Sequence, residues 1–383
     1  MKKNSIWNKT VRLVNILLGL GLGAGIAIMS PVIRNVRHLT FGQYLIGLGL
    51  LLIKIYLAFF LQLIFHEGGH LIFGLLTGYG FSSFRILNFM LIRKGNRIQL
   101  KKHSLSGTSG QCLMSPPELK DGRIPYVLYN LGGVLMNLIV SVLCAGLFFL
   151  LRSGEKYPEF LSIMALAGVY IALTNGIPLN ATVPNDGHNA FYLGKDPVAL
   201  RSFWVQLAVN AESAQEKRIK DMPEEWFIIP EEADMGNNLI ASWLTLTENR
   251  AMDLHDFGKA KQILDRLLGG ECELVELYRV LMLNDRAYID ILEKGKDADL
   301  SYLEEKDAAA VLKQMRNYPS VMRTDYASAL IAKQDRNEAE KILDRFRKIA
   351  LTYPSGADIA AEAELMEIAD SATGPEETVQ LTD

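Results

Sequence analysis

The feature that most restricts the fold is a run of mostly apolar residues at positions 43–79. As one straight helix this run would be roughly 55 Å long, because an α-helix rises about 1.5 Å per residue. The hydrocarbon core of a bilayer is only about 30 Å thick. We therefore expect this segment to cross a membrane and to tilt, to break, or to begin outside the core. Lys54, inside the run, is expected to snorkel to the interface.

Three further stretches are apolar enough to span a bilayer. They lie at residues 13–33, 124–151 and 160–177. The basic residues before the first stretch resemble the start of a signal peptide, but no small-residue cleavage site follows, so we interpret this stretch as a retained helix. The sequence thus predicts an all-α multi-pass membrane protein with about four transmembrane helices.

Between the second and third spans, residues 80–123 lack a helical pattern. Residues 83–87 and 97–101 are expected to form strands, separated by a turn at Lys94-Gly95-Asn96, which gives a small β-containing loop. The loop is rich in lysine and arginine, and such loops tend to remain in the cytoplasm. The basic N-terminus agrees, whereas Arg34 and Arg37 do not. On balance we expect a cell-membrane protein with both termini cytoplasmic.

The second half of the chain differs in composition, because residues 193–383 carry most of the acidic side chains. We expect a soluble α-helical domain at 193–370 and a disordered acidic tail at 371–383. Residues 260–267 are echoed by residues 339–346, which suggests a repeat-like domain with a groove for a protein partner. A generic helical bundle explains the echo nearly as well. The three cysteines have no spacing typical of disulfides or of a metal site.

A His-Glu-x-x-His motif lies inside the long apolar run. His66 and His70 are four residues apart, so both imidazoles lie on one helix face and can reach one metal ion. Glu67 can then act as general base on a zinc-activated water. Ionisable residues are costly inside a membrane and usually have a function there, which favours a catalytic site over chance.

A catalytic zinc ion needs a third protein ligand and an open position. Asp186 is the best candidate, because it follows the last span where Pro178 and Pro184 interrupt the helix. Such breaks at membrane depth are found where the backbone faces protein or water. His188 is the rival third ligand.

These motifs together resemble the site-2 protease family of intramembrane zinc metalloproteases. The order of elements is similar: His66-Glu67-Gly68-Gly69-His70, a strand-like loop, Gly132-Gly133-Val134-Leu135-Met136-Asn137, and then Asn175-x-x-Pro178 followed by Asp186-Gly187. The resemblance covers residues 43–192, which would be the protease core, with residues 1–42 as an accessory transmembrane helix. Two departures are the wide spacing of Asn175 and Asp186, which are eleven positions apart, and the Gly133-Val134 pair, where the family often has Gly-Pro.

The resemblance implies hydrolysis of a peptide bond in a transmembrane or membrane-associated peptide. Zn²⁺ would be held by His66, His70 and Asp186, with Glu67 as the catalytic base. Asn137 and Asn175 would contact the substrate or simply bridge helices. The partners would be a hydrophobic peptide, the bilayer and a protein bound by the helical domain, with no nucleic acid. The alternative is a non-catalytic membrane scaffold or adaptor whose helical C-terminal domain binds a partner.

Overall fold

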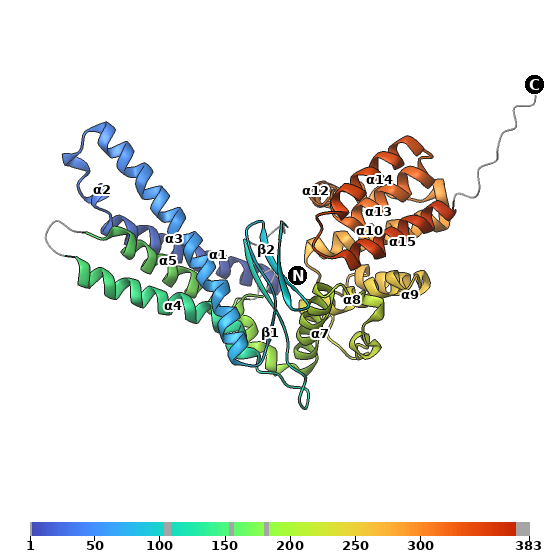
Figure 1. Cartoon of the computed structure of the whole chain (residues 1–383), viewed down its shortest axis with the longest axis horizontal. Coiled ribbons are helices and arrows are strands. Elements are labelled where there is room, and N and C mark those ends of the chain that lie inside the picture. Colours follow the sequence, from blue (N-terminus) through green and yellow to red (C-terminus); the bar gives the residue numbers. More distant parts are fainter. Residues whose placement is uncertain (1, 103–108, 153–156, 180–183, 373–383) are drawn as a thin grey trace, which may run out of the picture. The chain divides into compact units, whose positions relative to one another are not determined.

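The computed structural model describes residues 2–102, 109–152, 157–179 and 184–372, with side chains from residue 13 onward. The described chain is mostly helical, with one small antiparallel sheet (Figure 1). It divides into two compact units. The membrane unit comprises residues 1–90 and 104–197, and the helical unit comprises residues 91–103 and 198–383.

Three helices of the membrane unit are long and apolar enough to cross a bilayer: α3 (Phe41–Leu76), α4 (Tyr126–Leu151) and α5 (Glu159–Gly176). Their most apolar windows have mean hydropathies of 2.3, 2.6 and 1.3. Three of the four expected spans are therefore helices that could cross a membrane. The first expected span falls in α1 (Lys2–Met29), whose described apolar part, Leu13–Met29, is shorter than the others. That span stays a prediction.

Helix α3 is continuous over 36 residues, so the long apolar run does not break. Its start is fixed by a capping box in which Gln43 N donates to Thr40 Oγ1 and Thr40 N donates to Gln43 Oε1. Lys54 forms an ion pair with Glu159 at the start of α5. This lysine therefore has a protein partner within the bundle, in addition to any contact with the interface.

Helix α4 packs against both α3 and α5, and α1 packs against α5 (Figure 1). The α3–α4 contact depends on two glycines. A Cβ at Gly69 would lie 2.2 Å from Gly132 O, and a Cβ at Gly132 would lie 2.6 Å from Gly69 O. Any larger residue at either position would push the backbones apart, so the small residues let the helices pack closely around the motif.

The sheet contains β1 (Gly80–Ile86), β2 (Phe89–Lys94), β3 (Arg97–Lys102) and β4 (Gly110–Ser115) in the order β3-β2-β1-β4. Strands β1 and β4 are antiparallel, from Gly80 opposite Ser115 to Ile86 opposite Gly110. The two expected strands are present as β1 and β3, and the expected turn joins β2 to β3. The sequence did not indicate β2 and β4 as strands.

The turn between β2 and β3 belongs to the helical unit. The Gln215 side chain donates to Arg93 O at 2.7 Å and accepts from Gly95 N at 2.7 Å, while Lys94 pairs with Glu216. Both contacts of Gln215 are to backbone atoms, so they depend on the conformation of the turn and not on its side chains.

Short elements complete the membrane unit. They are α2 (Pro31–Arg34), η1 (Val36–His38), α6 (Asp186–Tyr192) and η2 (Leu193–Lys195).

The helical unit is built from helices and short helical turns. These are α7 (Pro197–Ala214), η3 (Ile219–Asp221), η4 (Glu224–Phe227), α8 (Asn238–Asp253), α9 (Phe257–Leu268), α10 (Glu276–Lys294), η5 (Gly295–Asp297), α11 (Ser301–Glu304), α12 (Lys306–Gln314), α13 (Pro319–Ala327), the π-helical turn η6 (Ser328–Ala332), α14 (Arg336–Ala350) and α15 (Gly356–Ala372). The echoed segments lie in α9 and α14; a repeat architecture stays a prediction.

One core cluster of this unit surrounds Trp243, which is fully buried and donates from Nε1 to Trp226 O at 2.7 Å. Val205, Val209 and Phe227 pack in the same cluster. Of the expected disordered tail at 371–383, the first two residues end α15, and residues 373–383 lie outside the described part of the chain.

Candidate metal centre

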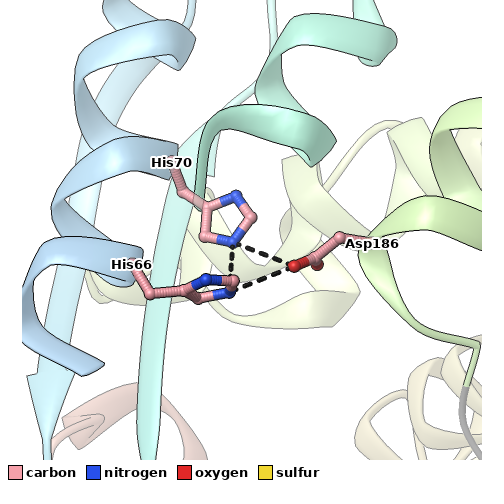
Figure 2. Close-up of side chains that lie close together, drawn as sticks. All are labelled: His66, His70 and Asp186. Carbon is pink, nitrogen blue, oxygen red and sulfur yellow. Dashed lines mark hydrogen bonds and ion pairs between the residues drawn. The ribbon is translucent and has the colours of Figure 1, made fainter. Parts of the chain in front are cut away.

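His66 and His70 project from one face of α3 toward Asp186 at the start of α6 (Figure 2). His66 Nε2 lies 3.1 Å from Asp186 Oδ2, His70 Nε2 lies 3.4 Å from it, and the two Nε2 atoms are 3.2 Å apart. Both histidines are buried, and the aspartate is half-buried. Three potential ligand atoms therefore converge on one point.

Asn185 holds Asp186 in this position. Its side chain caps α6 by accepting from His188 N at 2.9 Å, and it also accepts from Leu179 N at 3.0 Å. Its amide nitrogen donates to Thr174 O and Ile177 O at the end of α5. One side chain thus ties the start of α6 to the end of α5, where the carbonyls have no partners within the helix.

The hydrogen bonds of Asn137 assign the tautomer of His66. Asn137 Nδ2 donates to Gln62 O at 2.8 Å and to Gln62 Oε1 at 2.7 Å, so the amide oxygen faces the histidine. That oxygen lies 2.7 Å from His66 Nδ1. Since an amide oxygen only accepts, Nδ1 carries a proton, and in the neutral imidazole Nε2 presents its lone pair to the centre.

His70 reaches the same state through the backbone. Its Nδ1 lies 2.8 Å from Tyr129 O and donates to this carbonyl, so in the neutral imidazole Nε2 carries a lone pair. When both imidazoles are neutral, two lone pairs and a carboxylate face one another, and a metal ion at this point would bind all three. The hydrogen bonds made by the two Nδ1 atoms are those typical of metal-bound histidines.

The spacing also fits a metal ion. Ligand atoms bound at about 2.0–2.1 Å in a tetrahedral arrangement lie about 3.3 Å apart, close to the 3.1–3.4 Å separations here. Among the described residues, His66, His70 and Asp186 form the group that could hold a metal ion.

Gly133 on α4 provides the space for the His66 ring. A Cβ at this position would lie 2.5 Å from His66 Cε1 and 2.6 Å from both ring nitrogens. The ring could not keep its place beside any other residue type. The Gly132-Gly133 pair therefore serves both the contact between α3 and α4 and the orientation of the histidine.

Glu67 is also buried, and it lies against the sheet. A Cβ at Gly110, the first residue of β4, would lie 2.6 Å from Glu67 Oε1, so only a glycine lets the strand approach this carboxylate. Arg85 of β1 is almost fully buried, donates from Nη1 to Leu87 O, and attracts the charge of Glu67. The motif glutamate is thus held between a membrane helix and a strand at the edge of the sheet.

The other sequence candidates have different surroundings. His188 stacks its ring on Tyr192 at 4.8 Å, and Asp186, not His188, belongs to the metal group. Asn175 Nδ2 donates to Ile171 O within its own helix. Asn137 bridges His66 and Gln62, as described above. A role for Asn137 or Asn175 in binding substrate stays a prediction.

Sequence reasoning missed Gln62, Tyr129 and Gly110. Gln62 precedes His66 by four residues, so its place on the same helix face could have been noticed. Tyr129 contributes a backbone carbonyl, which leaves no trace in residue type. Gly110 lies on a strand that the sequence did not reveal.

Comparison with known proteins adds no relative: no protein family, no curated protein and no solved structure matches this chain. The argument for function therefore depends on the geometry of the centre.

Proposed function

We propose that this protein is an intramembrane zinc metalloprotease, similar to the site-2 protease family. The convergence of His66 Nε2, His70 Nε2 and Asp186 Oδ2 in a three-residue donor set carries the proposal. Two histidines and one carboxylate are typical of catalytic zinc, which retains an open position for water or substrate.

Each residue then has a defined task. His66, His70 and Asp186 hold the zinc ion, which when bound polarises the scissile carbonyl and acidifies a water molecule. Glu67 accepts the proton of the attacking water and returns it to the leaving amine. Its buried place beside the ligands on α3 and against β4 supports this role because a buried carboxylate can retain and return a proton.

The sheet supports a way to present the substrate. Strands β3 and β4 are the outer strands of the sheet, and β4 begins at Gly110 against Glu67. An extended peptide that paired with β4 would bring its backbone to the glutamate, as in β-strand addition. Cleavage needs this extended form, because a helical peptide bond is shielded by its own hydrogen bonding. The proposed substrate is a single-pass or short hydrophobic membrane peptide, cut near the cytoplasmic side.

The decisive experiment compares the intact protein with Glu67→Gln, Asp186→Ala and a control, Glu118→Gln, which alters an exposed carboxylate of the same unit. Zinc content is measured by mass spectrometry, and cleavage is followed on a tagged single-pass peptide that is co-expressed with each variant.

Glu67→Gln is expected to retain zinc and lose cleavage, Asp186→Ala to lose both, and Glu118→Gln to retain both. Normal cleavage by Glu67→Gln would refute the protease assignment. Retention of zinc without any cleavage by the intact protein would favour the membrane scaffold instead.

A further inference from the structure

A second candidate site lies within the helical unit. A partly open cavity of about 350 Å³ is lined by α7, α8, α10, α13 and α15, by Ile219 of η3, and by two tyrosines from the connecting segments. This volume falls within the range of sites for small ligands and side chains. It is far larger than a bare metal ion needs.

The cavity wall is predominantly acidic. Four carboxylates line it, from Asp253, Asp285, Asp358 and Glu362, against the single guanidinium of Arg323. Asp285 is paired with Arg323, and Asp253 is paired with Arg218. The two carboxylates of α15 remain without a full counterion.

Asp358 and Glu362 are four residues apart on α15, so they lie on the same helix face. Like charges at this spacing destabilise a helix. Glu362 Oε2 has no hydrogen-bond partner, and its nearest cation, Arg323 Nε, is 3.6 Å away. Asp358 has no ion-pair partner among the described residues. Burial of most of its side chain raises the pKa of Glu362 to about 7, whereas Asp358 is exposed.

The same region contains another uncompensated group. Glu248 of α8 is fully buried, and neither of its carboxylate oxygens has a hydrogen-bond partner among the described residues. Its charge interacts with those of Asp285, Arg323 and Glu362 on the cavity wall. Buried polar atoms without partners are rare in folded proteins and call for an explanation.

The remaining wall is suited to a long cationic side chain. Tyr278, Tyr318 and Tyr353 supply aromatic surface, and apolar residues such as Leu246 and Leu281 complete it. Lysine and arginine bury an apolar stem beside a charged head, and aromatic faces attract cations. The exposed amides of Asn210 and Asn249 lie on the same wall and can bond to a peptide backbone.

We propose that this cavity binds a peptide segment through a lysine or arginine side chain, whose charge is received by Asp358 and Glu362. The proposal does not depend on the protease assignment, because it concerns a binding site in the other unit. It gives the helical unit a chemically defined partner: an extended basic segment of another protein.

The test uses the full-length protein in detergent and fluorescence anisotropy of a labelled Ala-Lys-Ala-Arg-Ala-Lys-Ala peptide. A matched peptide with glutamine at the three basic positions is the control ligand. The variants are Glu362→Gln and Asp358→Asn, and the control variant is Asp344→Asn, which removes an exposed carboxylate of α14 outside the cavity.

The basic peptide is expected to bind and the glutamine peptide to fail. Each cavity variant should weaken binding about tenfold or more, and Asp344→Asn should leave it unchanged. Asn249→Ala, at an exposed position, should also weaken binding and guards against a folding defect in the other variants.

Equal binding of both peptides, or equal affinity in all variants, would overturn the proposal. So would saturation of the cavity by spermidine with no binding of the basic peptide, since this would assign a small free cation as the ligand. Circular dichroism of each variant establishes that the helical unit is folded.

Discussion

The two units arrange their buried polar side chains differently, although both contain buried polar atoms without hydrogen-bond partners among the described residues, such as Ser30 Oγ and Glu159 Oε1 in the membrane unit. Around the candidate metal centre the polar side chains form a continuous chain, in which His66 contacts Asn137, Asn137 donates to Gln62, and Gln62 donates to Met164 O. In the helical unit, carboxylates gather around Arg323, and Glu248 and Glu362 have oxygens without hydrogen-bond partners.

A polar group inside a bilayer has no water to bond, so partners within the protein stabilise it, as in this chain of contacts. A cavity in a water-exposed domain can leave carboxylates facing water. On the two proposals above, the membrane unit is organised around a candidate metal centre, whereas the cavity of the helical unit offers carboxylates to a ligand.

If the two units are energetically separate, unfolding one should leave the other intact. A substitution in the core of the helical unit tests this most strongly. Trp243→Ala removes a fully buried ring and should destabilise the helical unit by about 3–5 kcal/mol. Unfolding is followed by circular dichroism, and zinc content reports on the membrane unit. Leu351→Ala, at a position 81% exposed, is the control and should change neither. Loss of zinc together with stability in Trp243→Ala would show that the units are coupled.

A substitution that crowds the candidate metal centre should have the next largest effect, on zinc affinity. Gly133→Ala would place a methyl group against the His66 ring, so the ring must rotate away from the ion. We expect a loss of zinc affinity of about a hundredfold, measured by competition with a chelating dye. Gly146→Ala lies on the same helix with open space around it, and it should bind zinc normally. Normal binding by Gly133→Ala would mean that His66 is not a ligand in this orientation.

Breaking the chain of polar contacts should have a smaller effect. Asn137→Ala leaves His66 Nδ1 without its acceptor, which should lower zinc affinity about 10–100-fold, as is usual when the hydrogen-bond partner of a metal ligand is removed. Asn137→Asp supplies a carboxylate acceptor at the same place and should restore much of the affinity. If Asn137→Ala lost cleavage but kept full zinc affinity, the asparagine would instead serve the substrate.

The smallest effect concerns the pH dependence of the helical unit. Burial raises the pKa of Glu362 from 4.5 to about 7, so the folded unit holds a proton that the unfolded chain releases. Stability should therefore fall as the pH rises through this window, by on the order of 1–2 kcal/mol, and Glu362→Gln should reduce the slope. Three of the four tryptophans, Trp204, Trp226 and Trp243, lie in this unit, so their fluorescence reports its melting. An unchanged slope in the variant would assign the proton to another group.

The sequence by itself determined the long apolar helices and the two histidines of the candidate metal centre. Hydropathy located α3, α4 and α5, because length and apolar composition alone decide whether a helix can cross a bilayer. The four-residue spacing placed His66 and His70 on one face, because helical periodicity is local. The two strands found from sequence, β1 and β3, contain alternating polar and apolar residues, and a short segment is enough to reveal this pattern.

Tertiary structure decided what local pattern could not. Asp186 meets His66 across more than a hundred residues of chain, and His188 stacks on Tyr192 in a helix whose start Asn185 caps. The proton positions on both histidines depend on Asn137 and on a backbone carbonyl of α4. The cavity beside α15 likewise exists only because five separate helices line it. Such contacts depend on which helix faces pack together, and periodicity within one segment carries no information about its partner.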